Sequence, residues 1–424
     1  MALIFDIETD GFLENVTKIH CLVIKNSETG QVYEFTRLIE EGLNMLMAGS
    51  VISGHNVIKY DIPVIQKLYP WFEVDQSRVY DTLVVSRLIF SDLRERDGGA
   101  VEKGLLPNKL WASHSLKAWG YRLGVLKGEF KEQNGEGAFK EFTPEMLEYC
   151  VQDVEVTHTL YNHLTNIEYS QQSIEFEHQV AWRCAMMERS GWPFDVEGAA
   201  KLYSELVQKR DTIRTQMLET FEPLVIERVS EKTGKPLKPK VIEFNPGSRD
   251  QIAQRLVEKY GWEPKEFTPA GKPKVDEDTL KGLPYPEAQT LAEYFLLEKR
   301  IGQLAEGDQA WLKLERNGFI HGSINTNGAV TGRCTHNSPN IAQVPGAQSP
   351  YGKECRSLFG VKDGFKFVGV DLSGLELRCL AHFMARWDDG EYGHELLNGD
   401  IHTKNQLAAG LPTRANAKTF ISMG

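Results

Sequence analysis

Acidic residues near the start of the sequence have the spacing of a metal site. The stretch FDIETDG places Asp6 and Glu8 two residues apart, and residues at this spacing on a β-strand point to the same face. The residues before Asp6 are apolar, so we expect a buried strand that reaches solvent where the acids begin. Two such acids alone are most often solvated, so this pair needs support from elsewhere in the chain.

Two later stretches supply that support. GHNVIKYDIPVI places Asp61 on an expected helix after a strand, and YCVQD places Tyr149 and Asp153 one helical turn apart on one face. Each residue alone could be an ordinary surface acid or a half-buried ring. The ordered combination D-x-E, N-x-x-x-Y-D and Y-x-x-x-D is far less expected by chance.

Four carboxylates of this kind could hold divalent cations. Two divalent cations about 4 Å apart can clamp a scissile phosphate, one activating water and the other stabilising the leaving oxygen. Hard oxygen ligands favour Mg²⁺ or Mn²⁺. The residue types therefore fit a site that holds divalent metal ions.

These motifs resemble those of the DEDD exonucleases, in the branch that carries a tyrosine and a ribonuclease H-like fold. The resemblance covers about residues 1–168 and implies 3′–5′ exonuclease activity. It implies that Asp6 bridges both metals, that Glu8 and Asp153 complete the site that activates water, and that Asp61 holds the second metal through water. Tyr149 would orient the attacking water. The family contains RNA and DNA exonucleases, so this region alone does not select the substrate.

Motifs in the second half of the chain indicate that the substrate is DNA rather than RNA. It contains TGRCTHNSPNIAQVP, VGVDLSGLELR, GDIHTKNQ and TRANAK in that order. These motifs resemble those of family A DNA polymerases, most closely the replicative polymerases of short-tailed phages. The resemblance runs through nearly the whole chain, including HSLKAWGYRLG and KRIGQLAEGDQAW. It implies binding of single-stranded and primer-template DNA.

The same resemblance assigns roles to polymerase residues. It implies DNA contacts for Arg333 and Gln343, a metal ligand of an incomplete polymerase site at Asp371, and selection of deoxynucleotides by Glu376. Cations one helical turn apart suit a polyphosphate, and the resemblance implies that the incoming deoxynucleoside triphosphate contacts these residues: His402, Arg414 and Lys418.

The expected fold class is a multi-domain α/β protein. A ribonuclease H-like exonuclease domain would be followed by a helical thumb and an incomplete palm and fingers. The expected boundaries are a 3′–5′ exonuclease domain at 1–168, a helical entry to the palm at 169–200, a thumb at 201–316, a partial palm at 317–390, and the start of the fingers at 391–424. Within the palm, FKFVGVDLS is expected to form a strand that ends near Asp371.

A basic segment interrupts the thumb. EKTGKPLKPK combines prolines and a glycine with four lysines, namely Lys232, Lys235, Lys238 and Lys240. It is either a solvated loop or a basic tip that touches phosphates. The phage enzymes carry a long basic insertion near here that recruits thioredoxin, and this segment is much shorter. We therefore do not expect a thioredoxin partner.

Bulk composition narrows the class of protein. At 424 residues the chain exceeds a typical domain, and 41% hydrophobic residues suffice for packed cores. A net charge of -11 argues against a simple DNA-coating protein, although basic patches can be local. Six scattered cysteines without a CxxC pair fit a reducing cytoplasm, that of the host if a phage encodes the chain. No apolar run predicts a membrane span, and MALIFDIETD is interpreted as a buried strand rather than a signal peptide.

The segment LPTRANAKTFISMG is interpreted as the start of the fingers helix, faithful to the family through Ile421 and divergent at Ser422. In the family this helix continues to a tyrosine, and the second metal aspartate follows further along. Three hypotheses stay open. The chain is part of a split polymerase that a separate C-terminal chain completes, or a stand-alone 3′–5′ exonuclease with a DNA-gripping remnant, or a non-functional truncated product.

Overall fold

The computed structural model describes residues 1–128, 130, 135–229 and 234–417. The chain divides into two compact units, Met1–Gly360 and Val361–Gly424. Among the described residues, no helix is long and apolar enough to cross a membrane.

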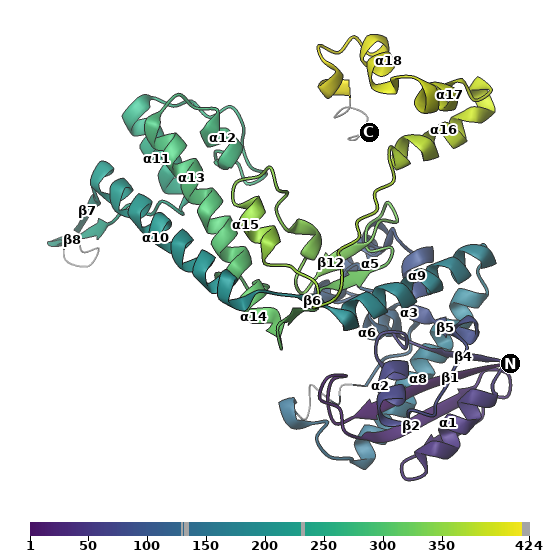
Figure 1. Ribbon diagram of the computed structural model, residues 1–424. Helices are drawn as coiled ribbons and strands as arrows, with labels where there is room; N and C mark the ends of the chain where they lie inside the picture. The colour runs from purple at the N-terminus through teal and green to yellow at the C-terminus, as the bar shows by residue number, and fades with distance from the viewer. Residues whose placement is uncertain (129, 131–134, 230–233, 418–424) are drawn as a thin grey trace. The chain divides into compact units, whose positions relative to one another are not determined.

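A five-stranded sheet organises the first part of the larger unit (Figure 1). Its strand order is β3-β2-β1-β4-β5, with antiparallel pairing among the first three strands and parallel pairing among the last three. The β-branched and aromatic residues of these segments favour extended backbone. The strands are β1 (Ala2–Thr9), β2 (Ile19–Asn26), β3 (Val32–Phe35), β4 (Val51–Gly54) and β5 (Val79–Asp81).

The central strand β1 separates two cores because its side chains alternate between the faces of the sheet. Ala2 and Ile4 pack with residues of helix α8, whereas Leu3 and Phe5 pack with residues of α1 and α2 on the other face. Asp6 and Glu8 continue the row of Ala2 and Ile4. The alternation of the strand therefore directs both acids to the face covered by α8.

Helices cover both faces of this sheet. Helix α8 begins as expected, since Thr143 caps it by accepting a hydrogen bond from the N–H of Met146 at 3.2 Å, and Pro144 occupies the first turn. The principal helices are α1 (Ile39–Ala48), α2 (Asp61–Leu68), α3 (Thr82–Ile89), α8 (Pro144–Thr165) and α9 (Gln171–Ser190). Shorter ones are η1 (Gln76–Arg78), α4 (Leu93–Arg96), α5 (Gly98–Glu102), η2 (Asn108–Leu110), α6 (Leu116–Leu123) and η3 (Gly135–Gly137).

A helical region follows α9. Helices α10 and α13 pack against each other, and Leu206, Leu256, Leu291 and Leu297 are fully buried in their common core. The helices are α10 (Val196–Thr220), α11 (Arg249–Tyr260), α12 (Glu277–Lys281), α13 (Pro286–Ile301), the π-helical turn η4 (Gly302–Glu306), α14 (Trp311–Leu314) and α15 (Gly352–Ser357).

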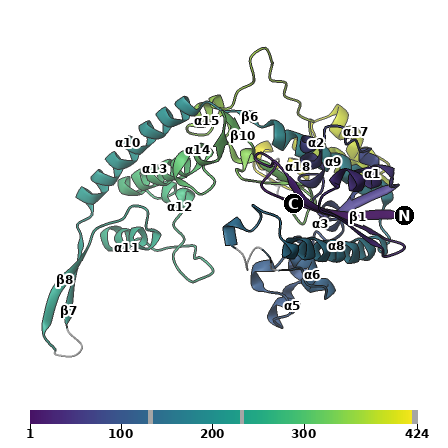
Figure 2. The same cartoon turned by 90° about the horizontal axis from the view of Figure 1, so that it is seen from below.

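The basic segment that the sequence left open as a solvated loop or a basic tip contributes to a hairpin in its described part. Strands β7 (Leu224–Val229) and β8 (Pro236–Ile242) pair antiparallel, and Figure 2 shows them as a ribbon beyond the end of α10. The β-branched residues that flank the prolines favour this pairing. Lys238 and Lys240 lie two apart on β8 and are exposed, while Lys232 lies outside the described residues.

Small sheets connect the helical region to the first domain. One has the order β6-β10-β9, and the other pairs β11 with β12. The strands are β6 (Trp192–Pro193), β9 (Glu315–Arg316), β10 (Phe319–Ile320), β11 (Ser323–Asn325) and β12 (Thr335–Asn337), followed by the turn η5 (Ile341–Gln343).

The smaller unit is helical where it is regular. Its helices are α16 (Leu375–Asp388), α17 (Glu391–Asn398) and α18 (Ile401–Ala408), and residues 414–417 begin a further helix. The strand predicted over FKFVGVDLS is wrong, because the described residues 365–373 form no strand. A strand needs a neighbour for its backbone hydrogen bonds, and Val368 and Val370 are instead 81% and 85% exposed.

Candidate metal centre

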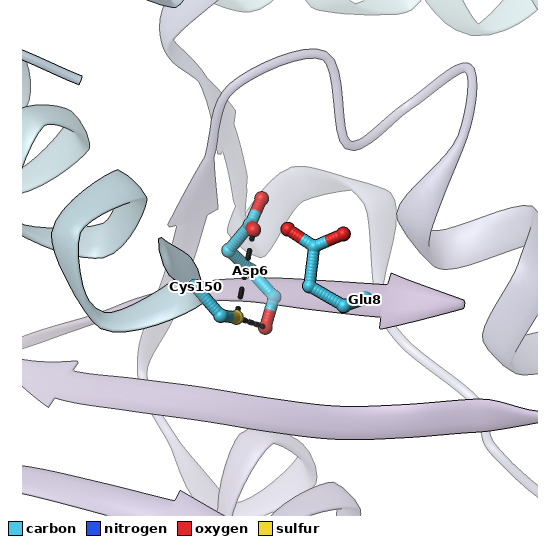
Figure 3. A group of neighbouring side chains, drawn as sticks. All are labelled: Asp6, Glu8 and Cys150. Atoms are coloured by element: carbon cyan, nitrogen blue, oxygen red, sulfur yellow. Dashed lines mark hydrogen bonds between the residues drawn. The ribbon is translucent and has the colours of Figure 1, made fainter. Parts of the chain in front are cut away.

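The carboxylates of Asp6 and Glu8 lie on the same side of β1, near its end (Figure 3). Glu8 is only 9% exposed. The thiol of Cys150, on α8, donates to the backbone oxygen and to Oδ2 of Asp6, at 3.5 and 3.6 Å. One ligand atom from each of these three residues lies within 4.8 Å of the others. The predicted D-x-E pair is therefore assembled against α8.

The third acid, Asp61, is the first residue of α2 and is 4% exposed. Two hydrogen bonds tie the start of this helix to the end of β1. The hydroxyl of Tyr60 lies 2.5 Å from that of Thr9 and donates to the backbone oxygen of Gly11 at 2.8 Å. They hold Asp61 close enough to Asp6 for the two carboxylates to repel each other.

Asp81 fixes the loop that leads to Asp61, a role the sequence analysis missed. It is 1% exposed, and its carboxylate accepts the backbone N–H groups of Asn56 and Ile58 at 2.9 and 3.1 Å. It also caps α3 by accepting the N–H of Leu83 at 2.9 Å. The aspartate before the helical pattern at Thr82 was the available signal, since an acid there is a common N-cap.

Helix α8 contributes the remaining predicted residues from one face. Asp153 is 2% exposed, and its Oδ1 is buried with no hydrogen-bond partner among the described residues. Tyr149, one turn earlier, is half-buried beside the rings of Phe130 and Phe139. Burial raises the pKa of Asp153, while Lys127 and, to a smaller extent, the hydroxyl of Tyr149 lower it. The structure therefore brings all five predicted exonuclease residues together.

The four carboxyl groups of this cluster can ionise together only with positive charge close by. Burial and then the charge of Asp153 raise the pKa of Asp6, while burial and then Asp6 raise that of Glu8. Burial also raises the pKa of Asp61, with Asp6 as the next cause, and that of Asp153. Like charges in low dielectric disfavour the ionised forms, so full ionisation requires counter-charge.

The donor set fits divalent metal ions. The carboxylates of Asp6, Glu8, Asp61 and Asp153 supply hard oxygen atoms, and Oδ1 of Asp153 still lacks a partner in the described structure. Such ligands suit Mg²⁺ or Mn²⁺. Asp6 and Glu8 could ligate directly from β1, and Asp153 from α8. The residues present therefore fit divalent metal ions, and the metal site stays a prediction.

Lys127 is a further part of this cluster that the sequence analysis missed. Its ammonium forms an ion pair with Oδ2 of Asp153 and lies 4.8 Å from the centre of the Tyr149 ring. It belongs to the segment between α6 and α8 and lies in neither a helix nor a strand. No periodic pattern in the sequence therefore indicated where its side chain would lie. Its proximity to the acids arises only in the folded chain.

The predicted polymerase residues are distributed over both units. Arg333 lies in the turn between β11 and β12, and Gln343 ends the short turn η5. Asp371 and Glu376 belong to the smaller unit and are exposed. The prediction that these residues form one site stays a prediction.

Two predicted nucleotide-binding residues lie close together in the smaller unit. Asp400 caps α18 by accepting the backbone N–H of His402 at 3.2 Å, and it also accepts two hydrogen bonds from Arg414, at 2.8 and 3.0 Å. The bond from Arg414 is the main cause that lowers the pKa of Asp400. Lys418 lies outside the described residues. The guanidinium of Arg414, predicted to bind the triphosphate, is therefore paired with Asp400 in this structure.

The chain is similar to known DNA polymerases over nearly its whole length. The model of the family described as DNA polymerase family A matches residues 215–409. The DNA-directed DNA polymerases of Enterobacteria phage T3 and Escherichia phage T7 are 41% and 40% identical over 525 residues, covering 99% of this chain and 74% of each relative. The match is longer than the 424-residue chain, so these relatives contain segments that this chain lacks.

A solved structure shares the fold. It is the POL domain of Pol1 from M. smegmatis, in a complex with DNA primer-template and dNTP. Its TM-score is 0.65 at 17% identity, and the match covers 99% of this chain and 67% of that one. The mixed α/β fold is therefore of the polymerase type.

Proposed function

The chain belongs to the family A DNA polymerases and is of the DNA-directed DNA polymerase type, and on that premise we propose that residues 1–168 are its proofreading 3′–5′ exonuclease. The observation that carries this proposal is the convergence of four carboxylates and Tyr149 from β1, α2 and α8. A structural role alone would not favour four carboxylates in one place when the ammonium of Lys127 pairs with only Asp153 among them.

The topology of the first domain supports the same proposal. The sheet order β3-β2-β1-β4-β5, with the acids at the end of its central strand, is the arrangement that we expect for a ribonuclease H-like fold. The boundaries at 168, 200, 316 and 390 are proposed with it, as are the thumb, palm and fingers that they delimit.

The proposed chemistry uses each side chain in a distinct way. Bound divalent ions would supply the Lewis acid that activates water and stabilises the leaving 3′ oxygen. Asp6, Glu8 and Asp153 would hold these ions by carboxylate oxygens, and Asp61 would hold the second one through water. The hydroxyl of Tyr149, beside Asp153, would orient the attacking water. The products would be deoxynucleoside monophosphates released from a DNA 3′ end.

The polymerase region would bind primer-template DNA and a deoxynucleoside triphosphate. We assign DNA contacts to Arg333 and Gln343, a metal ligand to Asp371, and nucleotide contacts to a further set: Glu376, His402, Arg414 and Lys418. Arg414 would have to exchange its pairing with Asp400 for the triphosphate. A guanidinium suits this exchange because phosphate and carboxylate accept the same bidentate hydrogen bonds.

Other partners stay as predicted from the sequence. No comparison supports a separate C-terminal chain. We still expect no thioredoxin partner. We also expect the protein to act in the host cytoplasm. The exposed Lys238 and Lys240 of β8 would add phosphate contacts in the thumb.

The exonuclease proposal is tested with a single-stranded DNA labelled at its 5′ end. With Mg²⁺ the label should pass through a ladder of shortening fragments, and EDTA should stop the reaction. The Asp6→Ala variant should leave the DNA intact. Degradation that survives this substitution would overturn the assignment of the site.

A further inference from the structure

The segment that carries Lys127 is fixed on the metal-binding helix. The side chain of Gln152, on α8, donates to the backbone oxygen of Leu126 at 2.7 Å. Gly128 packs so closely on Tyr149 that a Cβ there would lie 2.9 Å from the ring. Lys127 stands between these two anchors. Its place beside Tyr149 and Asp153 is therefore built into the fold.

The ammonium of Lys127 lies within the acid cluster. The ion pair with Asp153 is largely shielded, since the two side chains are 21% and 4% exposed. Oδ2 of Asp153 accepts from Lys127, while Oδ1 is buried and has no partner in the described part of the chain. One oxygen of a proposed metal ligand is thus already bound to a cation, and the other is not.

The charge of Lys127 reaches beyond Asp153. It lowers the pKa of Asp6, Glu8 and Asp153, against the larger effect of burial that raises all three. The same charge must repel any divalent cation that binds these carboxylates, because like charges repel each other with an energy set by their magnitudes, their separation and the surrounding dielectric.

We propose that Lys127 is a tethered counter-ion of the metal centre, which holds Asp153 in the metal-free protein and competes with the divalent cation for that carboxylate. The inference rests on the proposed metal site. It makes metal binding an exchange, in which one protein cation gives up its contact as the metal ion arrives. Lys127 is in this account a positioning residue rather than a catalytic one.

The opposite role is physically distinct. If Lys127 only held the Asp153 carboxylate in the orientation that binds the metal, its removal would weaken metal binding. If it competes, removal of the charge strengthens metal binding. The two roles predict opposite signs for one measured affinity.

The test is the binding of Mn²⁺ to the full chain, followed by electron paramagnetic resonance of the free ion. The signal of interest is the binding that Asp6→Ala abolishes. Lys127→Met should bind Mn²⁺ about tenfold more tightly at this site, because a like charge has been removed from a poorly screened position. Lys127→Arg, which keeps the charge, should resemble the native chain.

Lys140→Met is the matched control, since Lys140 is exposed in the same connection before α8. It should not change the affinity. As a second readout, Mn²⁺ should raise the melting temperature of Lys127→Met more than that of the native chain. Lys127→Gln serves in the same way if the methionine variant does not fold.

Each outcome has a definite meaning. An equal or weaker Mn²⁺ affinity in folded Lys127→Met and Lys127→Gln overturns the counter-ion role while leaving the metal site in place. The absence of any Asp6-dependent Mn²⁺ binding in the native chain would instead overturn the proposed exonuclease site itself.

Discussion

Lys59 and Glu188 form an ion pair, 2.5 Å from Nζ to Oε1, that joins the loop before Asp61 to helix α9. Lys59 also donates to the backbone oxygen of Ile324 at 2.6 Å, and Glu188 accepts the N–H of the same residue at 2.6 Å. Ile324 lies on β11, the strand that precedes Arg333. One network thus connects the proposed exonuclease site to the hairpin proposed to contact the primer.

The first prediction concerns this network. Lys59→Met should destabilise the larger unit by about 1–3 kcal/mol, because Glu188 loses a charged partner while it stays largely buried. The side chains of Lys59 and Glu188 are only 23% and 18% exposed. Thermal unfolding followed by circular dichroism measures the effect.

Lys272→Met provides the comparison for this loss. Lys272 pairs with Asp250 at the same distance of 2.5 Å, but those side chains are 61% and 63% exposed. Exposed pairs contribute about 0–1 kcal/mol. Equal melting temperatures for the two variants would show that the Lys59 network does not hold these parts together.

The second prediction concerns Asp81, which touches no proposed substrate. Asp81→Asn replaces one carboxylate oxygen by an amide donor facing backbone N–H groups, so the loop from Asn56 to Asp61 should shift. A small displacement of a ligand lowers the rate by about 10-fold to 100-fold, and we expect nuclease activity to fall in that range. Asp92→Asn, which breaks an exposed pair with Arg96, is the control and should retain activity.

The third prediction separates metal binding from water orientation. Tyr149→Phe should slow DNA hydrolysis by about 100-fold, the low end for a positioned proton-transfer or orienting group. Mn²⁺ affinity should hardly change, because the hydroxyl is not a proposed ligand. Tyr161→Phe, on the same helix and against Tyr80, is the matched control. Parallel losses of hydrolysis and Mn²⁺ affinity in Tyr149→Phe would contradict the assigned role.

The fourth prediction concerns pH. Burial and Asp153 raise the pKa of Asp6 from 3.8 to about 7 in the folded, metal-free protein. A raised pKa means that the folded state holds the proton more tightly than the unfolded state, so this stabilisation is lost as the pH rises through the folded value. Without metal, the native chain should therefore lose stability relative to Asp6→Asn from about pH 4, near the unfolded pKa, to about pH 7, near the folded pKa.

Divalent metal should reverse this trend, since it binds the ionised carboxylates. Melting curves in EDTA and in Mg²⁺ across this range give the comparison. A native chain that follows Asp6→Asn at every pH in EDTA would show that folding does not raise the pKa of Asp6.

The parts of the site that local periodicity governs were predictable from the sequence. Asp6 and Glu8 share a face because strand residues alternate, and Tyr149 and Asp153 share one because of the helical repeat. The helix start at Thr143 was predictable because threonine is a good N-cap residue and proline is favoured at the first helical position. Each of these relations depends on residues fewer than five positions apart.

Long-range relations were not predictable in the same way. Lys127 meets Asp153 only because Gln152 and Gly128 seat its segment on α8. The loop anchor at Asp81 depends on the pairing of β4 with β5. The expected strand before Asp371 failed for a related reason, since apolar β-branched residues specify a strand only where a partner strand is in place.

The most direct test of the central claim compares two aspartates that are assigned to different sites. Asp6→Ala and Asp371→Ala are assayed for shortening of a 5′-labelled single strand in Mg²⁺. If the nuclease resides in the first domain, Asp6→Ala abolishes the ladder and Asp371→Ala leaves its rate unchanged. A ladder that persists in Asp6→Ala, or that disappears in folded Asp371→Ala, would contradict the account.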